Sequence, residues 1–258
     1  MISIAASKCA GCKNCILFCP DDAINYQDKR CSIDQLTCTQ CGACLDSCPE
    51  KAIEFTPDSD PLKMFQMAIS NPGAGTMITG GNSGRGGHEV KTLDVVPRQK
   101  NDEITINLDI GRPGVGVYLR DAEKIILALI RAGMKFVPSA DFPLATIIPD
   151  KSTGKFRPDC LDMHFHTLLA EGIFKREQLP DIMKALLVVE KEIDTVFTVG
   201  LVMPVDKNCN NSALDCFDDL GIPRPHRGKI NVGLGRPWAP DLSDLSGQPC
   251  LDNHRSKQ

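Results

Sequence analysis

The sequence predicts an α+β protein in which a small cysteine-rich module is followed by a larger α+β domain. Nine of the 13 cysteines lie before residue 50, where they form two copies of one motif. Seven glycines fall within positions 73–87, a density that indicates a linker or a loop. The rest of the chain carries strand-like and helix-like apolar patterns. We therefore expect domains at 1–57 and 90–258, joined by a glycine-rich linker or lid at 58–89.

The cysteine motif occurs once from Cys9 to Pro20 and again from Cys38 to Pro49, and each copy is followed by an apolar pair suited to a short strand. Three cysteines in one tight loop direct three thiolates at a single iron-sulfur cubane. In the two-cluster arrangement, the fourth thiolate of each cluster comes from the other motif, from the cysteine that is followed by proline. We therefore predict two [4Fe-4S] clusters, one held by Cys9, Cys12, Cys15 and Cys48 and the other by Cys38, Cys41, Cys44 and Cys19.

With these eight cysteines and both prolines, about the first 57 residues resemble the bacterial-type ferredoxin family with two [4Fe-4S] clusters. The resemblance implies low-potential single-electron transfer in an oxygen-poor physiology. A zinc site built from the same thiols is the alternative. The ninth cysteine, Cys31, is expected to be a small buried side chain.

The pattern after the cysteine module predicts alternating strands and helices. Helical turns are expected at 62–69, a strand hairpin from 90–96 and 104–110, and a helix at 120–132 that Gly133 ends. Further strands are expected at 145–148 and 195–202, with a second helix at 178–191. Alternation at 161–165 adds a strand between the two helices and favours a β-α-β-β-α-β order.

Two Gly-Arg-Pro sequences place Arg112 and Arg236 just after predicted strands. If those strands are parallel neighbours, the two guanidinium groups meet at one sheet edge and form a receptor for a carboxylate or phosphate. The alternative is that Gly-Arg-Pro only terminates strands.

The other candidate ligands of the second domain form weaker patterns. Cys160, His164 and His166 suggest part of a soft metal site, although core or solvated histidines are the alternative. Cys209 and Cys216 suggest a third centre or a redox dithiol, against a simple packing or surface role. Cys250 has no assigned role. Phosphate-loop and dinucleotide-binding glycine motifs are absent from the sequence, which disfavours nucleotide-driven chemistry.

Composition narrows the function further. A net charge of -4 argues against a nucleic-acid binder, and no apolar run approaches the length of a membrane-spanning helix. We expect a cytoplasmic protein of anaerobic metabolism that delivers single electrons from its clusters to a redox partner protein or complex. The alternative is an oxidoreductase whose second domain binds an anionic small molecule that the clusters reduce.

Overall fold

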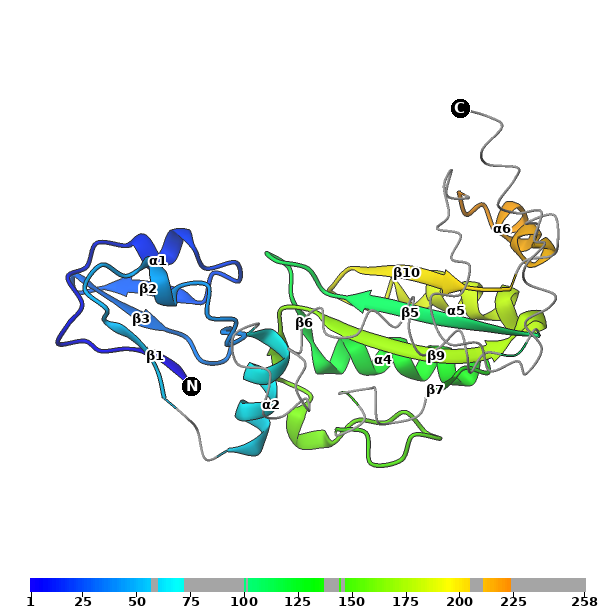
Figure 1. Cartoon of the computed structure of the whole chain (residues 1–258), viewed down its shortest axis with the longest axis horizontal. Coiled ribbons are helices and arrows are strands. Elements are labelled where there is room, and N and C mark those ends of the chain that lie inside the picture. The colour runs from blue at the N-terminus through cyan, green and yellow to red at the C-terminus, as the bar shows by residue number, and fades with distance from the viewer. Residues whose placement is uncertain are drawn as a thin grey trace, which may run out of the picture.

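The structure is a computed structural model, and it describes residues 1–56, 60–71, 100, 102–136, 144, 147–204 and 211–223. The cysteine-rich domain lies at one end of the molecule and the larger α+β domain at the other, with helix α2 (Pro61–Ser70) between them (Figure 1). The segment expected as a linker or lid therefore contains a helix. The glycine-rich stretch 73–87 lies outside the described residues.

The cysteine-rich domain is built from two small antiparallel sheets. Strand β1 (Ile2–Ile4) pairs with β4 (Ile53–Phe55), and β2 (Ile24–Gln27) pairs with β3 (Arg30–Ile33). The two strands expected from the repeated apolar pairs are thus confirmed as β2 and β4. Helix α1 (Asn14–Leu17) and a 3₁₀ turn, η1 (Leu45–Ser47), occupy equivalent places in the two cysteine motifs.

Helix α2 connects the two domains through its buried face. Asp60 caps it by accepting a hydrogen bond from the Leu62 N–H at 2.9 Å, and Pro61 occupies the first turn. Phe65 and Ile69 join the core of the larger domain, and the Phe65 ring meets the Phe165 ring edge-on with centroids 5.9 Å apart. The helix expected at 62–69 is confirmed.

The larger domain is a four-stranded antiparallel sheet in the order β10-β5-β9-β7. Its chain order is β5 (Glu103–Ile110), α4 (Leu119–Arg131), β7 (Lys135–Phe136), β9 (Leu168–Lys175), α5 (Leu179–Val189) and β10 (Phe197–Val202). The sheet and its helices follow the predicted β-α-β-β-α-β order in an α+β domain, but the two middle strands, β7 and β9, lie at other residues than expected. The remaining short elements are β6 (Val117–Tyr118), η4 (Pro158–Cys160), β8 (His164–Phe165), η5 (Arg176–Gln178), η6 (Ser212–Asp215) and α6 (Cys216–Asp219).

The core lies between this sheet and helices α4 and α5, which pack against one another (Figure 1). The alternating side chains of β5 and the apolar stripe of α4 are fully buried in it: Ile104, Ile106, Leu108, Ile110, Ala122, Ile125, Ile126 and Leu129. Gly133 follows α4 with a φ of 105°, as expected of a helix-ending glycine.

Two strand predictions need correction. Of the strand expected at 145–148, Ile147 and Ile148 are buried but form no strand, and the Ile147 N–H bonds to the Leu144 carbonyl; residues 145–146 lie outside the described residues. A short apolar run does not by itself distinguish a strand. In 161–165 only His164 and Phe165 form a strand, and this strand pairs with β6 outside the main sheet. The partner expected at 90–96 lies outside the described residues.

The sheet face opposite the helices is polar and yet buried. Thr105, Asn107 and Glu171 point to this face and are each at most 2% exposed, and Asn107 lies directly across from Glu171 in the β5–β9 pairing. Among the described residues, the Asn107 amide has no hydrogen-bond partner.

The described part of the chain contains no helix long and apolar enough to cross a bilayer.

Candidate metal centre

The two cysteine loops have the same backbone conformation, which the sequence repeat alone does not establish. Equivalent residues, 29 positions apart, adopt left-handed φ angles in three pairs: Gly11 (72°) and Gln40 (61°), Lys13 (67°) and Gly42 (80°), and Asp22 (50°) and Lys51 (47°). Each loop therefore curls in the same sense around the space between its cysteines.

Close approach explains why glycine occupies one of these positions. A Cβ added to Gly11 would lie 2.3 Å from the Lys29 carbonyl oxygen, so the hairpin between β2 and β3 can pack onto the first loop only if this residue has no side chain.

One cavity collects cysteines from both repeats. Its lining includes Cys19 from the first motif together with Cys38, Cys41 and Cys44 from the second. Cys9, Cys15 and Cys48 pack in the small core of this domain, which Cys19 and Cys44 also join, and Cys12 is exposed. The structure therefore brings the last cysteine of the first motif beside the first three of the second.

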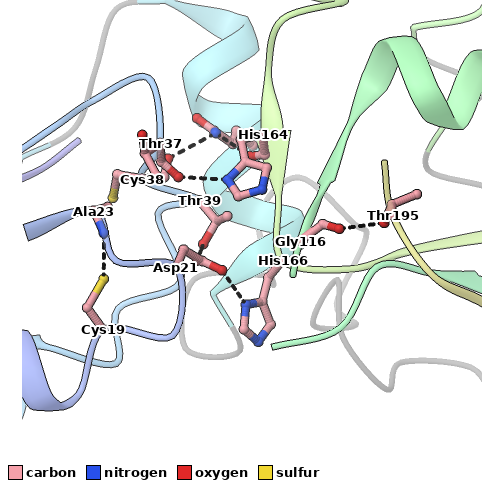
Figure 2. A network of polar contacts seen from close by, with 11 residues as sticks. Cys19, Asp21, Ala23, Thr37, Cys38, Thr39, Gly116, His164, His166 and Thr195 are labelled. Carbon is pink, nitrogen blue, oxygen red and sulfur yellow. Dashed lines mark hydrogen bonds and ion pairs between the residues drawn. The ribbon is translucent and has the colours of Figure 1, made fainter. Parts of the chain in front are cut away.

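Hydrogen-bond donors point at several of these sulfurs. The Ala23 N–H donates to Cys19 Sγ at 3.2 Å, and at the equivalent place in the other repeat the Ala52 N–H donates to Cys48 Sγ at 3.3 Å. Donors of this kind stabilise a thiolate and tune a metal bound to it. Figure 2 shows Cys19 and Ala23 in this arrangement.

The buried thiols need a cation to become charged. Burial raises the pKa of Cys38 to about 12 and the pKa of Cys44 to about 11. In contrast, hydrogen bonds from the Cys31 and Gly11 N–H groups hold the pKa of Cys9 below its usual value. A bound metal replaces the proton of a buried thiol and removes the cost of burying the thiolate.

Four thiols around one cavity are compatible with a cubane cluster. A cubane takes one thiolate on each of four irons, so its ligands surround a cavity and do not converge on one point. Four cysteines around one cavity fit such a group.

Arg112 lies at the end of β5, as predicted, but its guanidinium group is engaged within the sheet. It donates to the Gly111 carbonyl and to the Thr198 hydroxyl, both at 2.6 Å, and Asp109 lies 3.9 Å away. These contacts fit the alternative in which Gly-Arg-Pro ends a strand. Arg236, the other half of the expected anion receptor, lies outside the described residues.

Cys160, His164 and His166 do not gather into one site. Cys160 is buried and its thiol donates to the Arg157 carbonyl at 3.0 Å. His164 and His166 instead face the cysteine-rich domain (Figure 2). Among the remaining cysteines, Cys31 is buried as expected, the Cys216 thiol donates to the Ala213 carbonyl, and Cys209 and Cys250 lie outside the described part of the chain.

Sequence reasoning missed the polar junction between the domains. The His164 Nδ1–H donates to the Thr37 carbonyl at 2.7 Å, and the Gln66 amide donates to the Cys38 carbonyl at 3.2 Å and to the His164 carbonyl at 2.6 Å. The buried Asp21 carboxylate accepts from the Thr39 hydroxyl at 2.7 Å. No local sequence pattern predicts these hydrogen-bonded pairs, because their members are up to 127 positions apart in the chain.

Burial works against ionisation of the Asp21 carboxyl. Its contacts with His166, whose Nδ1 lies 3.5 Å from Oδ1, and with Thr39 outweigh burial and hold the pKa of Asp21 below its usual value. The junction therefore keeps a buried negative charge beside the Cys19 loop.

Paired, equivalent cysteine loops with N–H donors directed at their sulfurs are the arrangement expected of an iron-sulfur domain. Residues 1–49 match the family model of the 4Fe-4S dicluster domain, so the N-terminal region is ferredoxin-type, and the match implies 4Fe-4S clusters. No curated protein and no solved structure matches the chain.

Proposed function

We propose that this chain carries two [4Fe-4S] clusters and passes single low-potential electrons to a redox partner protein or complex in anaerobic, cytoplasmic metabolism. Cys9, Cys12, Cys15 and Cys48 hold one cluster, and Cys38, Cys41, Cys44 and Cys19 hold the other. When bound, each cluster supplies reversible one-electron chemistry.

The observation that carries this proposal is the cavity shared by Cys19, Cys38, Cys41 and Cys44. Interleaved motifs predict that the fourth ligand comes from the opposite repeat, and Cys19 supports that assignment by its position beside the second loop. The equivalent backbone of the first loop supports a second cluster built in the same way, as do the Cys31 N–H that donates to Cys9 Sγ and the Ala52 N–H that donates to Cys48 Sγ.

Metal analysis of the anaerobically purified full-length chain tests the proposal. We expect eight irons and eight inorganic sulfides per chain, with the electron paramagnetic resonance signals of reduced cubanes. Zinc in place of iron, or four irons with a complete set of cysteines, would contradict it.

The second domain favours one alternative, an oxidoreductase in which the clusters reduce a small molecule. This alternative draws on the buried polar face of the sheet, where the Asn107 amide lacks a hydrogen-bond partner among the described residues and lies across from Glu171. A buried, unpaired amide is costly, and a bound polar molecule would relieve that cost. In this alternative, Arg112 and Arg236 would in addition bind the charged group of an anionic ligand.

Mass spectrometry of the natively purified protein distinguishes these two functions. A small molecule that is retained in stoichiometric amount, and released when Asn107 is changed to Leu, would favour the oxidoreductase. Its absence, with rapid electron exchange to a copurified protein, would favour the carrier.

A further inference from the structure

The two cysteine loops share a backbone conformation, so the surroundings of equivalent residues in the two loops can be compared directly. Equivalent positions nevertheless differ in their surroundings. Thr39 is 1% exposed, whereas its counterpart Ala10 is exposed. Cys41 is partly buried, whereas its counterpart Cys12 is exposed.

The same asymmetry extends to the residues that flank both motifs. In four of the flanking pairs, the member in the half that carries Cys19 and Cys38 is partly buried and its counterpart in the other half is exposed: Pro20 against Pro49, Asp21 against Glu50, Thr37 against Lys8 and Gly42 against Lys13. Since the loops have the same shape, this difference reflects what lies against them, together with the smaller side chains at Thr37 and Gly42.

Helix α2 and the second domain provide the cover. His164 on β8 bonds to the Thr37 carbonyl, one residue before Cys38, and its ring stacks on Tyr118 with centroids 4.5 Å apart. Gln66 on α2 bonds to the carbonyl of Cys38 itself. Two hydrogen bonds thus fix the second domain to the backbone around one predicted ligand.

Close packing completes the cover on two further sides. The C-terminal end of α2 approaches the second loop, because a Cβ added to Gly42 would lie 2.8 Å from Asn71 Nδ2. The turn after β5 reaches the other ligand segment, since a Cβ on Gly114 would lie 3.7 Å from the Pro20 carbonyl oxygen. Figure 2 shows a further contact, between Asp21 and His166. Every one of these points lies within two residues of Cys19, Cys38 or Cys41.

We propose that the second domain is a cap for one of the two cluster sites. It covers the site of Cys19, Cys38, Cys41 and Cys44, here called the inner site, whereas its described residues leave the site of Cys9, Cys12, Cys15 and Cys48, the outer site, open to solvent at Cys12. This inference rests on the proposed function for the presence of two clusters, but it makes a separate claim, namely that their accessibility differs because of His164 and Gln66.

The physical consequence is unequal access for water and solutes. A chelator or an oxidant must reach the cluster that it attacks, and at the inner site it must first displace the cap. Solvent access and hydrogen bonds near the sulfurs also set the potential of a cluster, so two sites with identical loops need not have the same potential. The outer site is the one that a soluble redox partner can approach directly.

Iron release from the full-length, fully loaded chain tests the cap. Under aerobic conditions with an iron chelator in excess, we expect two phases of equal amplitude, the fast phase from the outer site and the slow phase from the inner site. His164→Phe retains the ring but loses the bond to the Thr37 carbonyl, and Gln66→Met retains the length but loses both amide bonds. His164→Phe should accelerate the slow phase about tenfold, the effect of one buried hydrogen bond, and Gln66→Met, which loses two, should accelerate it at least as much; both should leave the fast phase unchanged.

Lys124→Met is the control within the second domain. It removes contacts to Asp121 and to the Glu192 carbonyl, which lie away from the junction, and should alter neither phase. A second matched pair uses the repeat itself: Asp21→Asn should accelerate the slow phase, whereas Glu50→Gln, the same chemical change at the equivalent position, should not.

A second measurement does not depend on iron loss. A soluble gadolinium chelate should speed the relaxation of one reduced-cluster signal in the wild type and of both signals in the His164→Phe and Gln66→Met proteins. Release of all iron in a single phase that these variants leave unchanged, or acceleration of the fast phase, would overturn the cap. Fewer than eight irons at the start would instead contradict the proposed pair of clusters.

Discussion

The crossed arrangement of ligands predicts a specific non-additivity between cysteine substitutions. Cys19 lines the same cavity as Cys41 of the second repeat, whereas Cys12, which belongs to the same repeat as Cys19, is exposed. If Cys19 and Cys41 hold one cluster, Cys19→Ala alone and Cys41→Ala alone should each remove the same share of iron. Combining them should then cause no further loss.

The magnitude follows from the ligand sets, because each set of four thiolates holds about four irons. We expect about eight irons in the wild type and about four in each single variant. The Cys19→Ala, Cys41→Ala double variant should retain about four, whereas the Cys19→Ala, Cys12→Ala double variant should retain almost none.

Iron and sulfide analysis of anaerobically purified protein, with Mössbauer spectra to detect three-iron remnants, measures these shares. Cys31→Ala is the control, because Cys31 is buried in β3 but is not a predicted ligand, and it should leave all eight irons in place. Loss of nearly all iron in the Cys19, Cys41 double variant, with half retained in the Cys19, Cys12 double variant, would refute the crossed arrangement.

Three further predictions concern stability. Gly11→Ala should lower iron retention and cost at least roughly 1–2 kcal/mol, because the residue has a φ of 72° and its Cβ would lie 2.3 Å from the Lys29 carbonyl oxygen; iron content and thermal melting measure this. Ile106→Ala should cost about 2–5 kcal/mol in urea unfolding, while Val188→Ala at a 60% exposed site should stay within about 0.5 kcal/mol. Arg112→Ala should retain eight irons and cost about 1 kcal/mol, and a loss of iron would show that this arginine supports the clusters.

The sequence predicted the cysteine-rich domain well because its constraints are local. Ligand spacing, the prolines after the last cysteines and the repeated apolar pairs all lie within short windows, and the conformation of each loop depends on residues next to the ligands. The alternating side chains of β5 and the apolar stripe of α4 could also be predicted, because these patterns too are local in the sequence. Their core faces are apolar except for Asp121 in the first turn of α4.

Strand β9 was not predicted, because apolar and polar residues do not alternate clearly along its sequence. Glu171 and Gly172 interrupt an apolar run, and neither residue is typical of a central strand. The structure explains Gly172 by close approach, since a Cβ there would lie 2.4 Å from Met134 Sδ. Glu171 belongs to the buried polar face. Both residues therefore serve packing or polar requirements that only the tertiary structure defines.

The polar contacts between the cysteine-rich domain and the second domain fix the relative orientation of the domains more than they add to stability. The buried polar groups of this junction are incompletely paired: Gln66 Oε1 has no hydrogen-bond partner among the described residues, and the 3.5 Å between Asp21 and His166 exceeds a normal hydrogen bond. Unsatisfied buried groups of this kind offset much of what the satisfied ones contribute.

The apolar contact of Phe65 with Phe165 is therefore the better source of adhesion between α2 and the larger domain. The polar bonds around Cys38 instead admit one orientation of the second domain on the cysteine loop, because a hydrogen bond of 2.7 Å to a backbone carbonyl tolerates little displacement. A cap that must hold its position over one site requires such directional contacts, and an apolar interface alone would allow the two domains to slide.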